Sequence, residues 1–149
     1  MAERNTTNEL GFKTTYQQFL EKEGLPVIRA FHVEDIRQVE LSPWERRGGL
    51  GAYLNLEGTE GVNDCYIGEI PPGKSLNPQK HMFEELVFVI SGHGATTVWR
   101  DGKKKQTFEW QEGSLFSPPL NTWHQLFNGS GSEPARYLAV TTAPTMINL

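Results

Sequence analysis

The chain has 149 residues, the length of one ordinary domain. Its 14 Lys and Arg residues against 18 Asp and Glu residues give a formal charge of −4, and this balance argues against a nucleic-acid partner, which would need a basic face to replace counterions. A single cysteine, no signal-peptide pattern and no apolar stretch near the roughly 18 residues of a membrane span predict a cytoplasmic protein without disulfides or a membrane partner.

The composition favours an all-β domain. The chain contains 15 Gly and 9 Pro, and aromatic residues make up 11% of it while charged residues make up only 21%. Turn formers therefore separate short aromatic and β-branched runs, which is typical of a sandwich or barrel.

The first third of the chain is expected to be an N-terminal extension, residues 1–48, ahead of a β-barrel domain, residues 49–149. A short amphipathic pattern that ends at Gly24 predicts a helix over Thr15–Glu23. Val27–Phe31 follows as an extended segment, and the Pro and Gly residues of 42–49 predict a loop.

From Leu50 onward the chain is a series of short strands divided by Gly and Pro turns. Asp101-Gly102 is a strong hairpin signal, because this pair tolerates the positive φ angles of a type I′ turn. The expected strands are Ala52–Leu56, Tyr66–Ile70, Glu84–Ile90, Ala95–Trp99, Gln106–Trp110, Ser114–Phe116, His124–Phe127 and Tyr137–Thr142. About eight short strands with tight turns fit a single closed barrel or jelly roll.

Polar side chains stand at alternating positions ahead of one of these strands. On an extended strand Gln79, His81 and Glu85 share parity and project from one face. Polar groups on the core side of a strand must find partners, and a divalent metal ion satisfies imidazole and carboxylate groups together. His124, on a later strand, is placed to supply a fourth ligand.

This run resembles the first motif of the cupin family. The family pattern is Gly-x5-His-x-His-x3–4-Glu-x6-Gly, and the chain has Gly73, Gln79, His81, Glu85 and Gly92 at the corresponding positions. One departure separates the two: Gln79 stands where the first His of the motif usually stands.

A second run resembles the second cupin motif, Gly-x5-Pro-x-Gly-x2-His-x3-Asn. The matching residues are Gly113, Pro119, His124 and Asn128, and Asn121 stands in place of the middle Gly. Asparagine is the residue best able to adopt the same left-handed turn conformation. The two motifs come in the family's order, and twenty residues that read as a hairpin separate them.

The resemblance implies a cupin-type double-stranded β-helix, a jelly-roll barrel with a divalent metal ion in its mouth. Carried over by position, the metal ligands would be Gln79, His81, Glu85 and His124. If Gln79 binds weakly or is displaced, the other three form a facial triad that leaves positions open for substrate and dioxygen on Fe(II). This favours an Fe(II) oxygenase-type oxidoreductase acting on a small oxygenated organic molecule, with Mn(II), Zn(II) or Ni(II) as other possible metals.

Two other functions are open at this point. If Gln79 stays bound, as in the cupin-type phosphomannose isomerases, the ion would polarise a carbonyl without redox chemistry, as in an isomerase, epimerase or decarboxylase. Alternatively, the barrel keeps the site but serves as a non-catalytic module that binds or senses a small molecule.

Substrate contacts and partners are less clearly indicated. Arg46 and Arg47 lie in a Gly-rich loop where an arginine would bind a carboxylate or phosphate, although an ordinary exposed loop is the simpler interpretation. Tyr66 and Trp123 are further candidates for substrate binding. The apolar C-terminal end predicts a homodimer, with the N-terminal segment or Ile147–Leu149 at the interface, or else the point where a longer two-domain cupin would continue.

Overall fold

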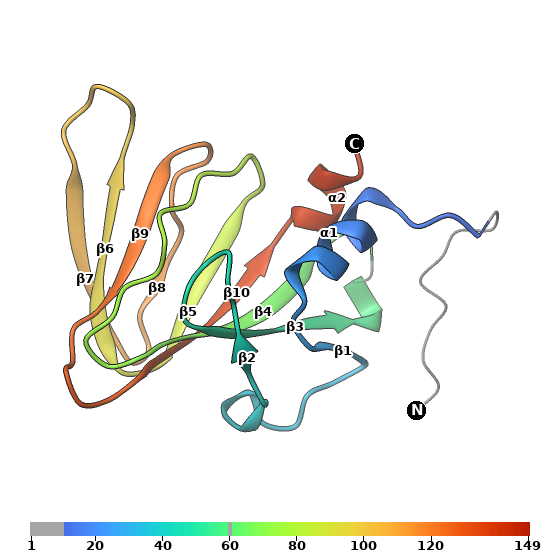
Figure 1. The fold of residues 1–149 in the computed structure, drawn as a ribbon, viewed down its shortest axis with the longest axis horizontal. Coiled ribbons are helices and arrows are strands. Elements are labelled where there is room, and N and C mark those ends of the chain that lie inside the picture. Colours follow the sequence, from blue (N-terminus) through green and yellow to red (C-terminus); the bar gives the residue numbers. More distant parts are fainter. Residues whose placement is uncertain (1–10, 60) are drawn as a thin grey trace.

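The computed structural model describes residues 11–59 and 61–149, so the first ten residues of the expected N-terminal extension lie outside the described residues (Figure 1). The strands are β1 (Val27–Ala30), β2 (Ser42–Pro43), β3 (Leu50–Leu56), β4 (Asp64–Ile70), β5 (Glu85–Ser91), β6 (His93–Trp99), β7 (Gln106–Gln111), β8 (Leu115–Phe116), β9 (Trp123–Asn128) and β10 (Ala135–Thr141). The helices are α1 (Thr15–Glu23) and α2 (Ala143–Ile147), with single 3₁₀ turns at Ile36–Gln38 and Glu57–Thr59.

The strands form two sheets, which confirms the all-β jelly-roll fold. The larger sheet has the order β1-β3-β4-β10-β5-β8, with β2 paired to β3, and the smaller sheet has the order β7-β6-β9. Neighbours are antiparallel except for β1, which runs parallel to β3. The two helices lie together at the end of the molecule opposite the β6–β7 hairpin (Figure 1). Within the described ranges, no helix is long and apolar enough to cross a bilayer.

Helix α1 has the predicted bounds, and its ends show why. The Thr14 side chain accepts a hydrogen bond from the Gln17 backbone N–H at 3.1 Å, and the Gln17 side chain accepts one from the Thr14 N–H at 2.8 Å. This capping box satisfies donors that the first turn leaves without partners. The helix ends at Gly24, whose φ of 67° is the left-handed conformation that glycine adopts without strain.

Two expectations about local structure are wrong. Ser42–Pro43, expected within a loop, forms β2 against β3. The apolar end of the chain, for which no element was predicted, forms α2. Elements of two and five residues are too short to show a periodic pattern. The extended strand expected through Gln79 and His81 is also absent, because the chain bends over residues 81–84 and β5 begins only at Glu85.

The core lies on both faces of the larger sheet. On the inner face, aromatic rings from β3, β4 and β10 pack with Trp44 and with residues of the smaller sheet, including Trp110 and Leu126. On the outer face, Ala52, Leu54 and Ile67 are covered by apolar side chains from residues 28–41. The described part of the N-terminal extension therefore packs against both faces of the sheet.

One glycine makes room for an aromatic ring at the centre of the inner core. Gly68 on β4 is paired with Tyr137 on β10, and a Cβ atom at Gly68 would lie 2.3 Å from the tyrosine Cζ atom. The Tyr137 ring in turn packs edge-on against Tyr66, at 5.9 Å between ring centroids. The ring of Tyr137 thus crosses over the bare backbone of β4.

The Gly68→Ala variant should lower the free energy of unfolding by about 1–3 kcal/mol, because a methyl group would overlap the Tyr137 ring. Urea unfolding measures this loss. Gly58→Ala is the matched control: the added methyl meets open space there, and we expect a change within about 0.5 kcal/mol. Equal stability of the two variants would show that the ring does not need the space above Gly68.

Candidate metal centre

Three separate segments bring His81, Glu85 and His124 together. Glu85 is the first residue of β5, His124 is the second residue of β9, and His81 lies in the segment that leads into β5. Gln79 forms an antiparallel bridge with His124, in which each backbone N–H donates to the other residue's carbonyl at 2.9 Å. The segment ahead of β5 is therefore fixed against the start of β9.

Asn121 fixes the same segment from the turn before β9. Its φ of 54° is positive, as predicted for this position, where the second cupin motif has glycine. In this conformation its backbone N–H donates to the His81 carbonyl at 3.0 Å. The left-handed turn thereby holds the backbone of His81 close to β9.

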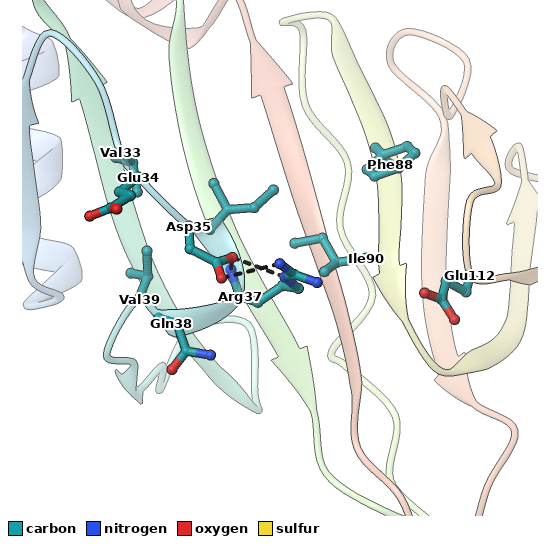
Figure 2. Close-up of a pocket in the computed structure, with 10 residues that line it drawn as sticks. Val33, Glu34, Asp35, Arg37, Gln38, Val39, Phe88, Ile90 and Glu112 are labelled. Carbon is teal, nitrogen blue, oxygen red and sulfur yellow. Dashed lines mark hydrogen bonds and ion pairs between the residues drawn. The ribbon is translucent and has the colours of Figure 1, made fainter.

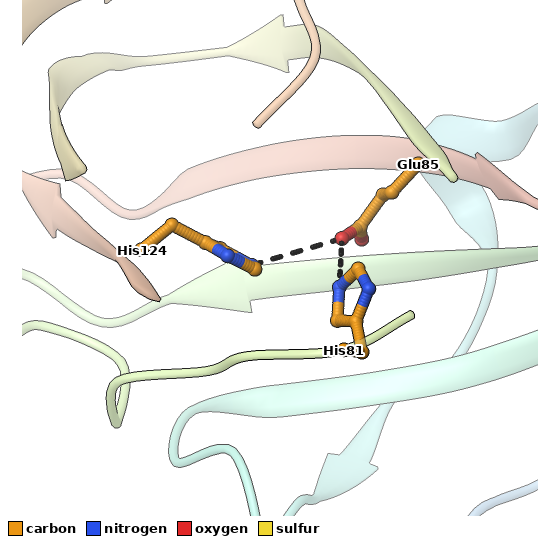
Figure 3. Close-up of side chains that lie close together, drawn as sticks. All are labelled: His81, Glu85 and His124. Atoms are coloured by element: carbon orange, nitrogen blue, oxygen red, sulfur yellow. Dashed lines mark hydrogen bonds and ion pairs between the residues drawn. The ribbon is translucent and has the colours of Figure 1, made fainter. Parts of the chain in front are cut away.

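The three side chains converge on one point (Figure 3). One potential ligand atom from each lies within 4.8 Å of the other two. The Oε2 atom of Glu85 is 3.0 Å from the Nε2 atom of His81 and 3.8 Å from the Nε2 atom of His124. Glu85 and His124 are each 2% exposed and His81 is 15% exposed, so the cluster reaches solvent on the His81 side.

Backbone carbonyls set the tautomer of both imidazole rings. The Nδ1 atom of His81 lies 2.8 Å from the carbonyl oxygen of Phe83, and that of His124 lies 3.2 Å from the carbonyl oxygen of Thr122. A carbonyl oxygen only accepts, so each Nδ1 carries a proton and Nε2 is the ring atom left to face Glu85. The Nε2 atom of His81 is within hydrogen-bond distance of the Glu85 carboxylate.

The two imidazole nitrogen atoms and the carboxylate oxygen are suited to bind a cation. The buried Nε2 atom of His124 has no hydrogen-bond partner in the described part of the chain, and burial lowers the pKa of this imidazole to about 4. The ring is therefore neutral near pH 7. A divalent ion between the two Nε2 atoms and the carboxylate oxygen would bind all three, and it would replace the proton of the His81–Glu85 hydrogen bond.

The other oxygen of Glu85 is already engaged. Tyr66 donates its hydroxyl to Oε1, and the Nη1 atom of Arg47 donates to that hydroxyl oxygen at 2.8 Å. Burial would raise the pKa of the Glu85 carboxyl, but the His81 hydrogen bond and the charge of Arg47 outweigh it and hold the pKa at about 2. Glu85 is therefore ionised and presents only Oε2 to the histidines.

Arg47 is buried, so the expectation of an exposed loop is wrong for this residue. It is 4% exposed, and its guanidinium lies 5.3 Å from the ring centroids of both Trp44 and Tyr66. Its Nη1 atom is 3.9 Å from the Oε1 atom of Glu85. Arg47 thus supplies a permanent positive charge behind the carboxylate.

Arg46 and Gln79 form a separate hydrogen-bonded group near the cluster. The side-chain oxygen of Gln79 accepts a hydrogen bond from Arg46 Nη1 at 2.6 Å. The Nε atom of Arg46 donates to the buried carboxylate of Glu23, at the end of α1, at 2.7 Å. The amide oxygen of Gln79, which the motif places at a ligand position, is therefore turned toward Arg46.

Trp123, a candidate for substrate binding, lies outside the cluster of His81, Glu85 and His124. Its ring stacks on Trp99 at 6.3 Å between centroids, and the Nζ atom of Lys80 lies 5.8 Å from the ring centroid. Successive residues of a strand point to opposite faces, so the inward position of His124 turns Trp123 outward. The carbonyl groups of Phe83 and Thr122, which contact the two imidazole rings, could not be predicted from the sequence, because backbone atoms leave no residue-type signal.

A cavity lies elsewhere, over the outer face of β5 (Figure 2). It has a volume of about 950 Å³ and is lined by residues 33–39 together with Phe88, Ile90 and Glu112. Its Asp35 and Arg37 side chains pair with each other at 2.9 Å. None of the three converging residues lines it, so the candidate metal centre and this cavity are separate.

Comparisons with known proteins agree with the geometry. The family model described as "Cupin domain" matches residues 66–141. No curated protein matches the sequence.

Several solved structures share the fold. An oxalate decarboxylase of Lactobacillus farciminis in complex with formate has 21% identity and a TM-score of 0.60, over 73% of this chain and 32% of that chain. The cupin domain of Schizosaccharomyces pombe Cnp3 has 17% identity and a TM-score of 0.59, over 72% and 71%. Tomato (Solanum lycopersicum) vicilin has 19% identity and a TM-score of 0.58, over 65% and 30%. The matched part is thus about a third of the oxalate decarboxylase.

The Tyr66→Phe variant should bind a divalent metal about 10–100-fold more weakly, because Oε1 of Glu85 loses the donor that orients the carboxylate. Titration of the metal-free protein with Fe(II) under argon, followed by calorimetry, measures the affinity. Tyr53→Phe is the control, since it removes a hydroxyl that contacts Glu23 at 3.1 Å instead of Glu85. Unchanged affinity in Tyr66→Phe would refute the positioning role of this tyrosine.

Proposed function

The chain belongs to the cupin family, and we propose that it is a metal-dependent enzyme whose ion is held by His81, Glu85 and His124. The observation that carries this proposal is the convergence of two imidazole Nε2 atoms and one ionised carboxylate oxygen on a single point. In each candidate ligand, the polar atom that does not face the cluster is held by a second contact. Phe83 contacts His81, Thr122 contacts His124 and Tyr66 contacts Glu85. Such outer contacts are typical of metal-binding side chains.

The position of Gln79 favours three protein ligands over four. Its amide oxygen accepts a short hydrogen bond from Arg46, whose guanidinium is anchored by Glu23. A set of two histidines and one carboxylate is typical of non-haem Fe(II) oxygenases. We therefore propose an oxygenase-type oxidoreductase acting on a small oxygenated organic substrate; Fe(II) bound in such a set supplies open positions for a chelating substrate and for dioxygen.

The surrounding residues support chemistry at this point. The ring of Phe83 stacks on His81 with centroids 3.9 Å apart and an angle of 5° between the planes, which fixes the imidazole on the side nearest solvent. Arg47 adds a positive charge in a buried, low-dielectric environment, where it acts more strongly than in water. Negative charge that develops on a substrate at this site would be stabilised by it.

A redox-neutral lyase is the second candidate. Two observations favour it: the fold is similar to that of an oxalate decarboxylase, and the Gln79 side chain is on the same face as His124, its bridge partner. If the amide turned from Arg46 to the ion, a four-ligand set would polarise a substrate carbonyl without electron transfer. Mn(II) and Zn(II) accept the same ligand atoms.

Gln79 and His124 pair in the β-bridge, and replacing each in turn distinguishes a site with three protein ligands from one with four. We expect Gln79→Leu to retain the wild-type amount of bound metal per chain, while His124→Leu loses it, because only the imidazole nitrogen is free to bind. Elemental analysis after gel filtration measures both, and circular dichroism confirms that each variant is folded. Equal loss in Gln79→Leu would contradict the three-ligand set and favour the redox-neutral candidate.

Oxygen consumption tests the proposed activity. Protein loaded with Fe(II) under argon should consume dioxygen when small hydroxy and oxo acids or catechols are added, and Glu85→Gln should not, since it removes the ligand charge. An oxygen electrode measures the rate, and mass spectrometry identifies the product. Release of carbon dioxide without oxygen uptake would overturn the oxygenase proposal in favour of a decarboxylase. Tight ligand binding without turnover would instead indicate a binding module.

A further inference from the structure

A second cavity lies at the end of the molecule where α1 and α2 meet. It has a volume of about 120 Å³ and is lined by residues of α1, β1, β3, the turn before β4 and the end of α2. His81, Glu85 and His124 are absent from its lining, so it is distinct from the candidate metal centre. Pockets for drug-sized ligands measure about 300–1,000 Å³, and this cavity therefore has room only for a molecule of a few heavy atoms.

Arg29 provides the one formal charge among the described residues that line this cavity. It lies on β1, where its neighbour across the parallel pair is Asn55. Within the described part of the chain, its guanidinium has no hydrogen bond or ion pair, whereas Arg37, Arg46, Arg47 and Arg136 all do. Arg29 is a partly buried residue, and its guanidinium, without a partner among the described residues, has five N–H donors available to an occupant of the cavity that it lines.

Two amide side chains add donors whose orientation is fixed. The Oδ1 atom of Asn148 accepts the backbone N–H of Tyr16 at 2.8 Å, and the Oε1 atom of Gln17 accepts that of Thr14 at 2.8 Å. A backbone N–H can only donate, so in both side chains the oxygen is the engaged atom. The NH₂ groups of Asn148 and Gln17 then have no partner among residues 11–59 and 61–149, and both residues line the cavity.

The carboxylate of Asp64, which directly follows the lining residue Asn63, is engaged by other groups. Asp64 does not line the cavity, and its oxygens accept the hydroxyl groups of Tyr16, at 2.5 Å, and of Thr141. The cavity thus offers a guanidinium and two amide NH₂ groups. Guanidinium groups bind carboxylate and phosphate through paired, charge-assisted hydrogen bonds.

We propose that this cavity binds a small oxyanion, a carboxylate or inorganic phosphate, through Arg29, Gln17 and Asn148. Arg29 lies on β1, Gln17 lies on α1 and Asn148 directly follows α2, so an ion bound by all three would connect these elements. Binding to the folded chain alone raises its stability by mass action. The site is therefore an anion-dependent clamp that holds both helices on the sheet, independent of the chemistry at the metal centre.

Thermal unfolding with sodium phosphate or sodium acetate, at ionic strength held constant with sodium chloride, tests the proposal. The wild-type midpoint should rise saturably with at least one of the two ions, and the responsive ion identifies the preferred geometry, tetrahedral or planar. The rise should persist in His124→Leu, which removes a candidate metal ligand, and in Arg37→Gln, which removes an exposed guanidinium elsewhere. If neither ion raises the unfolding midpoint saturably above its value in sodium chloride, the proposal is overturned.

Two variants locate the ion. Arg29→Gln should abolish the rise, and Asn148→Asp should abolish it as well, because a carboxylate oxygen would replace the NH₂ group while the other oxygen still accepts the Tyr16 N–H. Asn148→Asp keeps the shape of the side chain, so it tests the site even if Arg29→Gln folds poorly. An undiminished rise in folded Asn148→Asp would place the ion elsewhere and refute the assignment.

Discussion

The structure depends on an ionised carboxylate buried inside a barrel. Removing a charge from water costs several kcal/mol unless other charges and hydrogen bonds compensate. Glu85 is compensated on one side by the Tyr66 hydroxyl and the Arg47 guanidinium. On the other side the Nε2 atoms of His81 and His124 face it, and that of His124 has no hydrogen-bond partner among the described residues. The protein thus compensates one side of Glu85 fully, and the three groups on the other side could hold a metal ion.

Much of the inner core serves this arrangement. Trp44 and Tyr66 enclose the guanidinium of Arg47, and Tyr137 packs against Tyr66 over the bare backbone of Gly68. These rings exclude water from one side of the carboxylate, which strengthens the electrostatic interactions there. The N-terminal helix contributes from further out, since its last residue anchors Arg46, which holds the amide of Gln79. Fold stability and site geometry thus share the same side chains.

The sequence predicted the parts of the molecule that local patterns determine. Helix α1, the strand series and the jelly-roll class follow from capping residues, turn residues and the two motifs, and Asn121 adopts the left-handed turn that its motif position requires. The bend at residues 81–84 was not predicted. The motif spacing nevertheless identified His81 and Glu85, which meet across this bend. Contacts between distant segments were not predictable: Arg46 and Gln79 are 33 residues apart, and no local pattern shows that they pair.

The most direct test is a crystal structure of the protein loaded with Fe(II) under argon, with anomalous diffraction data collected at the iron edge. The account predicts one anomalous peak bonded to His81 Nε2, Glu85 Oε2 and His124 Nε2, at about the 2.0–2.2 Å typical of such ligands, with the Gln79 amide still turned to Arg46. A fully iron-loaded protein without a peak at this point, or with the iron bound by other residues, would contradict it.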